Sequence, residues 1–283
     1  MTCRVLACIL AIIPAALAAA QQSPPSRRYA TAITPAPVLN TPDFNKVFGG
    51  ALRLDPCRGV RPIEFVALTG TLFAIEGERE NGGHTVYRVS TRDYPYRSGA
   101  GLFVDARFVE LVVEPHQERQ RALPGLSEVQ QRLMAALGKP YVWGGNLKEG
   151  VPLLRKLYPQ SDPLAGVDCS GLLYQATDGF TPRNTSALTA FGVAVPVAGL
   201  SAEEIAQRLR PLDLIAWKGH VMVVLDRDSI IQSTMGCQGE GGVRMSPLQE
   251  TVRKLMKSRR PMDHYPPGGT GARGFVVRRW FPR

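Results

Sequence analysis

A change of pattern near residues 114–126 is the feature that most constrains how this chain can fold. Before it, three stretches are rich in Val, Phe, Tyr and Thr, as short strands are: "FVALTGTLFAIEGE", "TVYRVSTRDYPY" and "GLFVDARFVELVVE". The segment "ENGGH" between the first two has the glycines of a tight turn. We therefore expect about five strands over residues 51–115, enough for a small all-β barrel of SH3-like size.

Helix signals begin after this boundary. Three serines each stand three positions before Glu or Gln, a spacing that predicts helix starts: Ser127 with Gln130, Ser201 with Glu204, and Ser246 with Gln249. Four apolar stretches, "LDLIAW", "HVMVVLD", "SIIQST" and "GFVVRRWF", predict strands between and after these helices. We predict an α+β domain over residues 127–283, joined to the β unit by a linker at residues 116–126.

The N-terminal segment predicts export. Residues 1–20 combine Arg4, an apolar run and small residues at 18–20, which are the three parts of a secretory signal peptide. A lipid anchor at Cys8 is the less favoured alternative, because almost no apolar segment precedes it. No later stretch approaches membrane length, so we expect no transmembrane segment and a periplasmic or cell-wall location. Residues 21–50, rich in Pro, Thr, Ala and Ser, predict an extended or disordered lead-in.

The formal net charge of +10 favours an anionic partner, such as a cell-wall polymer or a membrane surface. Nucleic acid is the weaker interpretation. The basic residues at 253–260 predict one solvated helix face, and no stacking aromatics alternate with them. The sequence does not specify an oligomeric state.

Cysteine usage indicates a free thiol. If residues 1–20 are removed, Cys57, Cys169 and Cys237 remain. An odd number in an oxidising compartment leaves at least one thiol free or requires an intermolecular bond. Should Cys169 be the free one, Cys57 and Cys237 are either unpaired or bonded to each other.

Cys169 lies in "GVDCSGLLYQA", just before a short apolar run that predicts a helix. A thiol at a helix N-terminus beside a histidine has its pKa lowered to roughly 3.5–7.5, which makes it a nucleophile. The alternative is a buried, inert cysteine.

His220 differs from the other histidines because it begins a predicted strand. His84, His116 and His264 lie in turns or loops. If "DRD" centres a hairpin on residue 226, His220 faces Gln232 across the two strands. Gln232 would then orient the imidazole of His220 and leave its other nitrogen for Cys169. A one-residue slip would put Gln232 on the other face.

The ordered segments "PYVWGG", "GVDCSGL", "RPLDLIAWKGHVMVVLD" and "IIQS" resemble the motifs of NlpC-type cell-wall cysteine peptidases. The resemblance covers about residues 127–281 and, since an SH3-like module often precedes such domains, extends to about residue 50. It implies a papain-like fold and cleavage of the γ-D-glutamyl to diamino acid bond of peptidoglycan stem peptides. It implies Cys169 as nucleophile, His220 as general base and Gln232 as orienting residue.

The resemblance also implies further roles. Tyr141 matches a tyrosine near the oxyanion, with an aromatic core residue as the alternative. Asp168 and Ser170 match residues that hold the free amine of the terminal L-alanine, and Asp168 could equally cap the helix. Three weaker candidates for substrate binding are Arg183 and Thr185 in "TPRNTS" and Tyr96 in "DYPY", with Tyr94 beside it.

Two departures from the family pattern stand out. The segment at 146–167 is longer than usual, and "VPLLRKLYP" within it predicts an added helix near the cleft. The third catalytic position is often histidine, and Gln232 cannot share the charge of His220, so we expect modest activity. The resemblance implies no cofactor, and the cysteines and histidines lack zinc spacing. Two alternatives remain: a wall-binding protein without turnover, and a papain-like amidase or acyltransferase acting on another substrate.

Overall fold

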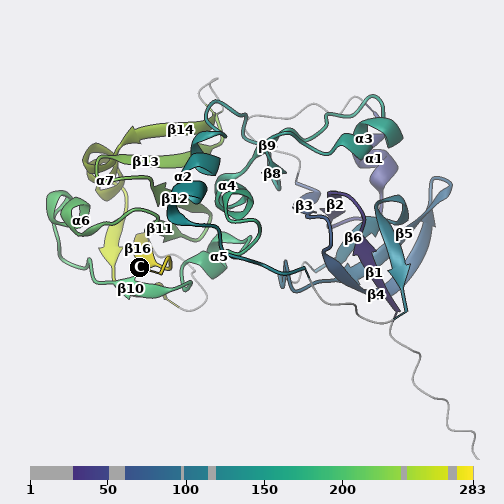
Figure 1. Ribbon diagram of the computed structural model, residues 1–283, viewed down its shortest axis with the longest axis horizontal. Coiled ribbons are helices and arrows are strands. Elements are labelled where there is room, and N and C mark those ends of the chain that lie inside the picture. The colour runs from purple at the N-terminus through teal and green to yellow at the C-terminus, as the bar shows by residue number, and fades with distance from the viewer. Residues whose placement is uncertain are drawn as a thin grey trace, which may run out of the picture.

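The computed structural model describes residues 28–50, 61–96, 99–113, 119–236, 241–266 and 273–282. Two units lie side by side in Figure 1, an N-terminal β unit at the right and a unit of sheet and helices at the left. Each unit has a sheet of its own. The α+β organisation predicted from the sequence is confirmed.

The first sheet has seven strands in the order β3-β2-β6-β5-β4-β1-β7, and its described pairings are antiparallel. The bounds are β1 (Arg28–Ala32), β2 (Ala36–Leu39), β3 (Ile63–Ala67), β4 (Leu72–Asn81), β5 (His84–Ser90), β6 (Leu102–Asp105) and β7 (Val109–Val112), with helix α1 (Phe44–Phe48) after β2 and a 3-10 turn η1 (Ala106–Phe108) after β6. The five strands β3 to β7 lie in the region where we expected about five.

The expected lead-in at residues 21–50 is wrong from Arg28 onward. Strand β1 lies between β4 and β7, and β2 lies between β3 and β6, so both are inner strands of the sheet. Their buried side chains include Ala30 and Ala32, which are fully or almost fully covered. Small alanines among Pro and Thr give little hydrophobic contrast, which is why this pattern did not predict strands.

The closed SH3-like barrel that we expected is not formed by the described strands. β3 and β7 are the two edges of the sheet, and no pairing within the described ranges joins them. The core under the sheet is aromatic and fully buried, with Phe44, Phe48, Phe65, Phe73 and Phe108.

The second sheet follows the order β10-β16-β11-β12-β13-β14, with β15 pairing parallel to β16. The bounds are β10 (Val193–Val195), β11 (Leu214–Trp217), β12 (His220–Val224), β13 (Ser229–Thr234), β14 (Gly242–Pro247), β15 (Arg260–Met262) and β16 (Gly274–Arg279). The sequence predicted β11, β12, β13 and β16. It did not predict β10, β14 and β15, which are short or largely polar.

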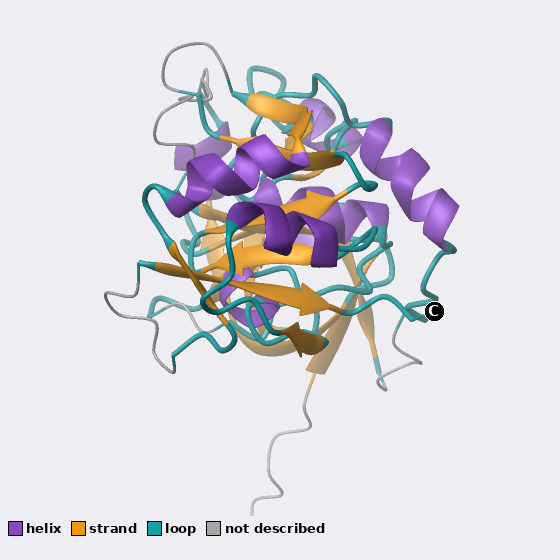
Figure 2. Cartoon of the chain, turned by 90° about the vertical axis from the view of Figure 1, so that its left-hand side faces the viewer, coloured by secondary structure: helices purple, strands orange, loops and turns teal. Residues whose placement is uncertain are grey.

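Helices cover both faces of this sheet, and in Figure 2 this unit faces the viewer. Helices α2 (Leu126–Met134) and α4 (Cys169–Ala176) pack on one face, and α6 (Ala202–Arg208) and α7 (Leu248–Met256) on the other. Strand β11 is buried on both sides because its side chains alternate between the two cores.

One of the three predicted helix starts is confirmed. Ser201 and Glu204 form a complete capping box at α6. Ser127 lies inside α2, which begins after Gly125, and Ser246 lies before the N-cap of α7. The Ser246 hydroxyl instead lies 3.0 Å from the Thr251 hydroxyl, so it does not reach the helix backbone.

The long segment at 146–167 supports the N-terminal unit and does not line the pocket around Cys169, which corrects our expectation of an added helix near the cleft. Its helix α3 (Pro152–Leu157) leads to Tyr158, whose ring lies 5.6 Å from that of Phe48. The Tyr158 hydroxyl donates to Asp105 at 3.0 Å and lies 3.2 Å from His84. His84, predicted to be a surface histidine, has a side chain only 10% exposed.

Several predictions fall outside the described residues. These are the signal peptide at residues 1–20 and the state of Cys57 and Cys237. Within the described ranges, no helix combines the length and apolar character needed to cross a membrane.

Candidate active site

Cys169 is the first residue of α4, where the sequence predicted a helix N-terminus. The N-cap is Asp168, whose Oδ1 accepts from the Gly171 N–H at 2.7 Å. Leu172 and Leu173 are buried against the sheet, so the apolar stripe fixes the orientation of the helix. Cys169 is a free thiol, 6% exposed.

The thiol lies in a pocket of about 110 Å³ between the two units. The pocket is lined by Glu64, Tyr94, Tyr141, Trp143, Gly144, Asp168, Cys169, Ser170, Arg183, Asn184, Thr185 and Gly219. Both sheets therefore supply walls of the same pocket.

His220 and Gln232 meet as predicted. The His220 Nε2 lies 2.8 Å from Gln232 Oε1. The register that we used to predict this contact is wrong by two residues, because β12 and β13 pair Val223 with Ile231 and Val224 with Ile230. A shift of two keeps both side chains on the same face, so the contact forms diagonally.

The strand of His220 lies against the nucleophile. A backbone hydrogen bond from Val221, the residue after His220, reaches the Cys169 thiol. The Gly219 N–H, just before His220, donates to the Thr185 Oγ1 at 3.0 Å. Thr185 thus holds the turn that presents the histidine.

Burial has a larger effect on the charge states of Cys169 and His220 than the helix N-terminus has. Burial, and then the charge of Asp168, raise the pKa of the Cys169 thiol to about 12. The lowered thiol pKa that we expected is therefore wrong for this structure. Burial also lowers the pKa of His220, and the charge of Arg259 adds to this effect. A thiol and a neutral imidazole are the resting forms at neutral pH.

Tyr141 lies in the pocket with Cys169, as the sequence predicted. Burial, followed by the charge of Asp168, raises the pKa of its hydroxyl. The hydroxyl therefore stays protonated and can donate a hydrogen bond to an oxygen in the pocket.

Asp168 is engaged by Arg183, which is 4% exposed. The guanidinium donates from Nη1 and Nη2 to the two Asp168 oxygens at 2.9 and 2.7 Å. Its remaining N–H groups reach Ser170 Oγ at 2.8 Å, Gly145 O at 3.2 Å and Asn146 Oδ1 at 3.2 Å. This network occupies both Asp168 and Ser170, which the sequence assigned to a substrate amine.

Asn146 connects this network to the first sheet. Its Oδ1 accepts from the Val66 N–H at 3.0 Å, and its Nδ2 donates to the Val66 carbonyl at 2.9 Å. Asn146 is fully buried. Strand β3 is thereby held against the catalytic unit.

Glu64, two residues before Val66 on β3, is a pocket residue that the sequence did not predict. Its carboxylate accepts from the Tyr94 hydroxyl at 2.9 Å and from Asn40 Nδ2 at 2.7 Å. Tyr94 is 5% exposed and stacks on Phe65. No arginine or lysine neutralises Glu64 among the ion pairs of the described residues. Glu64 could be recognised as a pocket residue only from the tertiary docking of β3.

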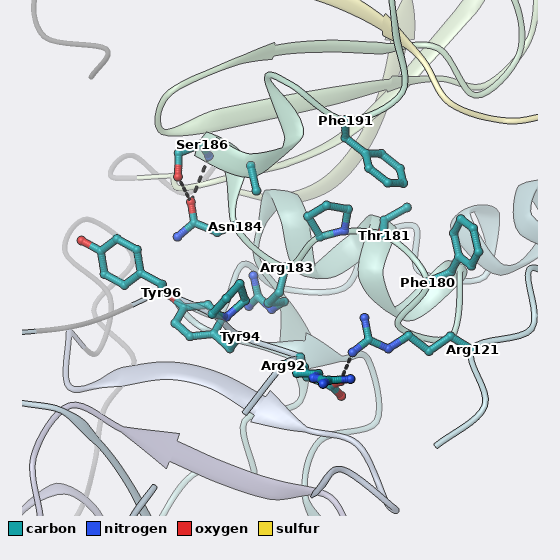
Figure 3. Close-up of a pocket in the computed structure, with 14 residues that line it drawn as sticks. Arg92, Tyr94, Tyr96, Arg121, Phe180, Thr181, Arg183, Asn184, Ser186 and Phe191 are labelled. Carbon is teal, nitrogen blue, oxygen red and sulfur yellow. Dashed lines mark hydrogen bonds and ion pairs between the residues drawn. The ribbon is translucent and has the colours of Figure 1, made fainter. Parts of the chain in front are cut away.

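Tyr96 lies outside the catalytic pocket. It is 51% exposed and lines a neighbouring cavity of about 430 Å³ that shares Tyr94, Arg183 and Asn184 with the pocket. Figure 3 shows Tyr96 at one end of this cavity and Phe180 and Phe191 at the other. Tyr94, rather than Tyr96, is therefore the tyrosine of "DYPY" that reaches the site.

Among the described residues, no group of three or more His, Cys, Asp or Glu side chains is arranged to hold a metal ion.

Comparison with models of known protein families finds no match, and comparison with curated proteins finds none. Among solved structures, the chain is similar to an NlpC/P60 family protein from Bacillus cereus, with 17% identity, a TM-score of 0.35, and coverage of 91% of this chain and 64% of that one. The peptidoglycan hydrolase RipB from Mycobacterium tuberculosis is 22% identical with a TM-score of 0.34, and the match covers 56% of this chain and 65% of RipB. NlpC2 from Trichomonas vaginalis is 14% identical with a TM-score of 0.34, and the match covers 90% of this chain and 73% of NlpC2.

The chain thus spans just under two thirds of the first two of these proteins. Such low TM-scores establish no common fold. The assignment of function therefore depends on the residues of the site.

Proposed function

We propose that this protein is an exported cysteine endopeptidase that hydrolyses peptidoglycan stem peptides at the bond between γ-D-glutamate and the diamino acid. The observation that carries the proposal is the arrangement around Cys169: a free thiol at the start of α4, beside a strand whose histidine is bound by Gln232 at 2.8 Å. The four ordered sequence motifs support the choice of substrate.

In the first step, the Cys169 sulfur attacks the carbonyl carbon of the γ-D-glutamyl amide, and its proton passes to His220. Because both groups are neutral at rest, this transfer accompanies the attack. The C–N bond then breaks, His220 gives its proton to the leaving amine, and a thioester remains on Cys169. Water then attacks the thioester carbonyl and loses a proton to His220, the C–S bond breaks, and His220 returns the proton to the Cys169 sulfur as the acyl fragment leaves as a carboxylic acid.

The tetrahedral oxyanion would be stabilised by two donors, the Tyr141 hydroxyl and the backbone N–H of Cys169. Tyr141 lies in the pocket and stays protonated. Donors of this kind contribute roughly 2.7–4 kcal/mol each to the transition state.

The substrate's free amine is best matched by Glu64. Asp168 already forms a bidentate ion pair with Arg183, so its charge is compensated. Glu64 is instead a carboxylate at the wall of the pocket, held by hydrogen bonds to Tyr94 and Asn40. An ammonium group would give it the charge-assisted partner that the protein does not supply.

The test uses the mature protein and the Cys169→Ala variant with defined muropeptides and with intact sacculi, followed by mass spectrometry of the products. The expected result is that the wild type alone cuts stem peptides with a free N-terminal alanine and releases L-Ala-γ-D-Glu, while stems attached to sugar are not cut at this bond. Cleavage at another amide would redirect the proposal to a different amidase. No cleavage, with both proteins sedimenting with sacculi, would replace it with a wall-binding function.

A further inference from the structure

An arginine–tryptophan stack lies directly beside His220. The guanidinium carbon of Arg259 lies 4.5 Å from the centre of the Trp217 ring, and that ring lies 5.1 Å from the imidazole of His220. Trp217 and His220 are direct partners in the pairing of β11 with β12. The Trp217 ring therefore contacts both Arg259 and His220, the proposed base.

The backbone around Arg259 is fixed. Its N–H donates to the Leu255 carbonyl at 2.9 Å, at the end of α7, and the next N–H, from Arg260, donates to Arg273 at 2.8 Å. Arg260 begins β15, which pairs with β16. The backbone position of Arg259 is thus set by a helix end and a strand start rather than by a free loop.

Arg259 has a charge that the protein leaves uncompensated. No carboxylate lies within ion-pair distance of it among the described residues, whereas Arg253 on the same helix pairs with Glu203 and Arg279 pairs with Asp213. Stacking on Trp217 holds the cation by a contact that consumes none of its five N–H donors. Those donors can bind an anion.

The stack lies on the leaving-group side of the site. The pocket that would hold the acyl fragment is walled by Glu64, Tyr94 and Tyr141, and it reaches the histidine strand only at Gly219. In the proposed reaction His220 protonates the leaving amine, so the leaving fragment must lie beside His220. The Trp217–Arg259 stack is a positively charged feature next to His220.

We propose that Arg259, supported by Trp217, binds a carboxylate of the leaving diamino acid fragment. The inference rests on the proposed function and adds a substrate requirement to it: the fragment that departs is anionic. Arg259 is thus a specificity residue for the leaving side, complementary to Glu64 on the acyl side.

The experiment compares two peptides, L-Ala-γ-D-Glu-L-Lys with a free C-terminal carboxylate and the same peptide with a C-terminal carboxamide. The wild type should cleave both at the same bond and prefer the carboxylate by roughly 10- to 100-fold in kcat/KM, the range of one charge-assisted hydrogen-bonding contact. Arg259→Ala should remove the preference by raising KM for the carboxylate peptide alone. Arg259→Lys should keep part of it, because the charge remains.

Lys257→Ala is the matched control, since it removes an exposed positive charge two residues away and should leave the preference intact. A second measurement is the acid limb of the pH profile. The charges that act on His220 are Arg259 and Asp168, and removal of the first should raise the pKa of His220 and shift the limb to higher pH.

A wild type that cleaves both peptides equally would overturn the assignment of Arg259 and leave the peptidase function standing. So would an Arg259→Ala variant that loses the same factor on both peptides. No cleavage of either peptide by the wild type would refute the proposed function, and the assignment with it.

Discussion

At the scale of single residues, the charge states of Cys169 and His220 decide how the site can work. A helix N-terminus favours a thiolate by no more than about 2 kcal/mol. The loss of hydration around a thiol that is 6% exposed opposes it, and the resulting pKa of about 12 shows that burial is the larger effect. Gln232 binds His220 but supplies no charge to stabilise an imidazolium. In the proposed reaction, the proton must therefore pass from Cys169 to His220 during the attack.

This charge state predicts the pH dependence of the proposed activity. Protonated His220 cannot accept the thiol proton, and its pKa is lowered from 6.5, so kcat/KM should fall only as the pH drops below that value. The value of kcat/KM should not rise again near pH 8.5, although an ordinary thiol ionises at about this pH. The pH profile of peptide cleavage and the rate of Cys169 alkylation by iodoacetamide would measure both. Fast alkylation under acidic conditions would contradict the neutral pair.

The positions of Cys169, His220 and Gln232 were the part of the site that the sequence could predict. Cys169 stands before an apolar stripe with helical spacing, and His220 and Gln232 flank a short turn. The His220–Gln232 contact survived an error of two residues in register because side chains on a strand alternate with period two. The thiol pKa could not be predicted, because it depends on burial by residues distant in the chain.

At the scale of structural elements, the buried pair of Asp168 and Arg183 joins α4 to the segment before α5 (Thr185–Leu188). Asp168 also accepts from the Gly144 N–H at 3.1 Å, in the loop that carries Tyr141. Through Asn146 the same network reaches β3. Its members are therefore positioning residues, which set the distances between the elements that carry Cys169, Tyr141 and Glu64.

Arg183→Ala should lower the free energy of unfolding by about 3–5 kcal/mol, because it leaves the Asp168 carboxylate buried without its partner. Chemical denaturation followed by fluorescence would measure the change. The double variant Asp168→Asn, Arg183→Ala should be less unstable than Arg183→Ala alone, since it no longer buries an unpaired charge. Equal loss in the two variants would show that the ion pair is not the source of the stability.

Elements with strong local signals were predicted well, and those that depend on tertiary pairing were not. The Ser201–Glu204 capping box is satisfied within one helical turn, so its sequence alone determined the start of α6. Strand β14 contains exposed Met245 and Arg244 and is held by six paired positions with β13. Such a strand shows no alternation of its own, and only its neighbour defines it.

At the scale of the whole molecule, the two units build one site. The N-terminal unit supplies Glu64 and Tyr94, and the second unit supplies Tyr141, Asp168 and Cys169. We expected an SH3-like module close to the cleft, but the sequence could not place Glu64 there. Its position depends on the docking of β3 against Asn146, two segments eighty residues apart.

The Glu64→Gln variant tests whether the N-terminal sheet supplies the carboxylate that binds the substrate amine. It preserves the shape of the side chain but removes the charge, so KM for peptides with a free N-terminal amine should rise by roughly 10- to 100-fold. Cleavage of the N-acetylated peptide should change little. The matched control is Glu80→Gln, an exposed glutamate on the same sheet. A rise in KM that is equal for free and acetylated peptides would remove Glu64 from amine recognition.

Under the proposed function, the docking of β3 also limits how much of a polymer the protein can process. A pocket of about 110 Å³ with a carboxylate at its wall admits a short acyl fragment that ends in an ammonium group. Such a pocket would accommodate two residues that begin at a free N-terminus, so the bond after the second residue would be the one cleaved. Stem peptides still attached to sugar have no free end to count from. The enzyme would then work downstream of whichever amidase separates peptide from glycan, and act as a finishing step in wall turnover rather than as the first cut.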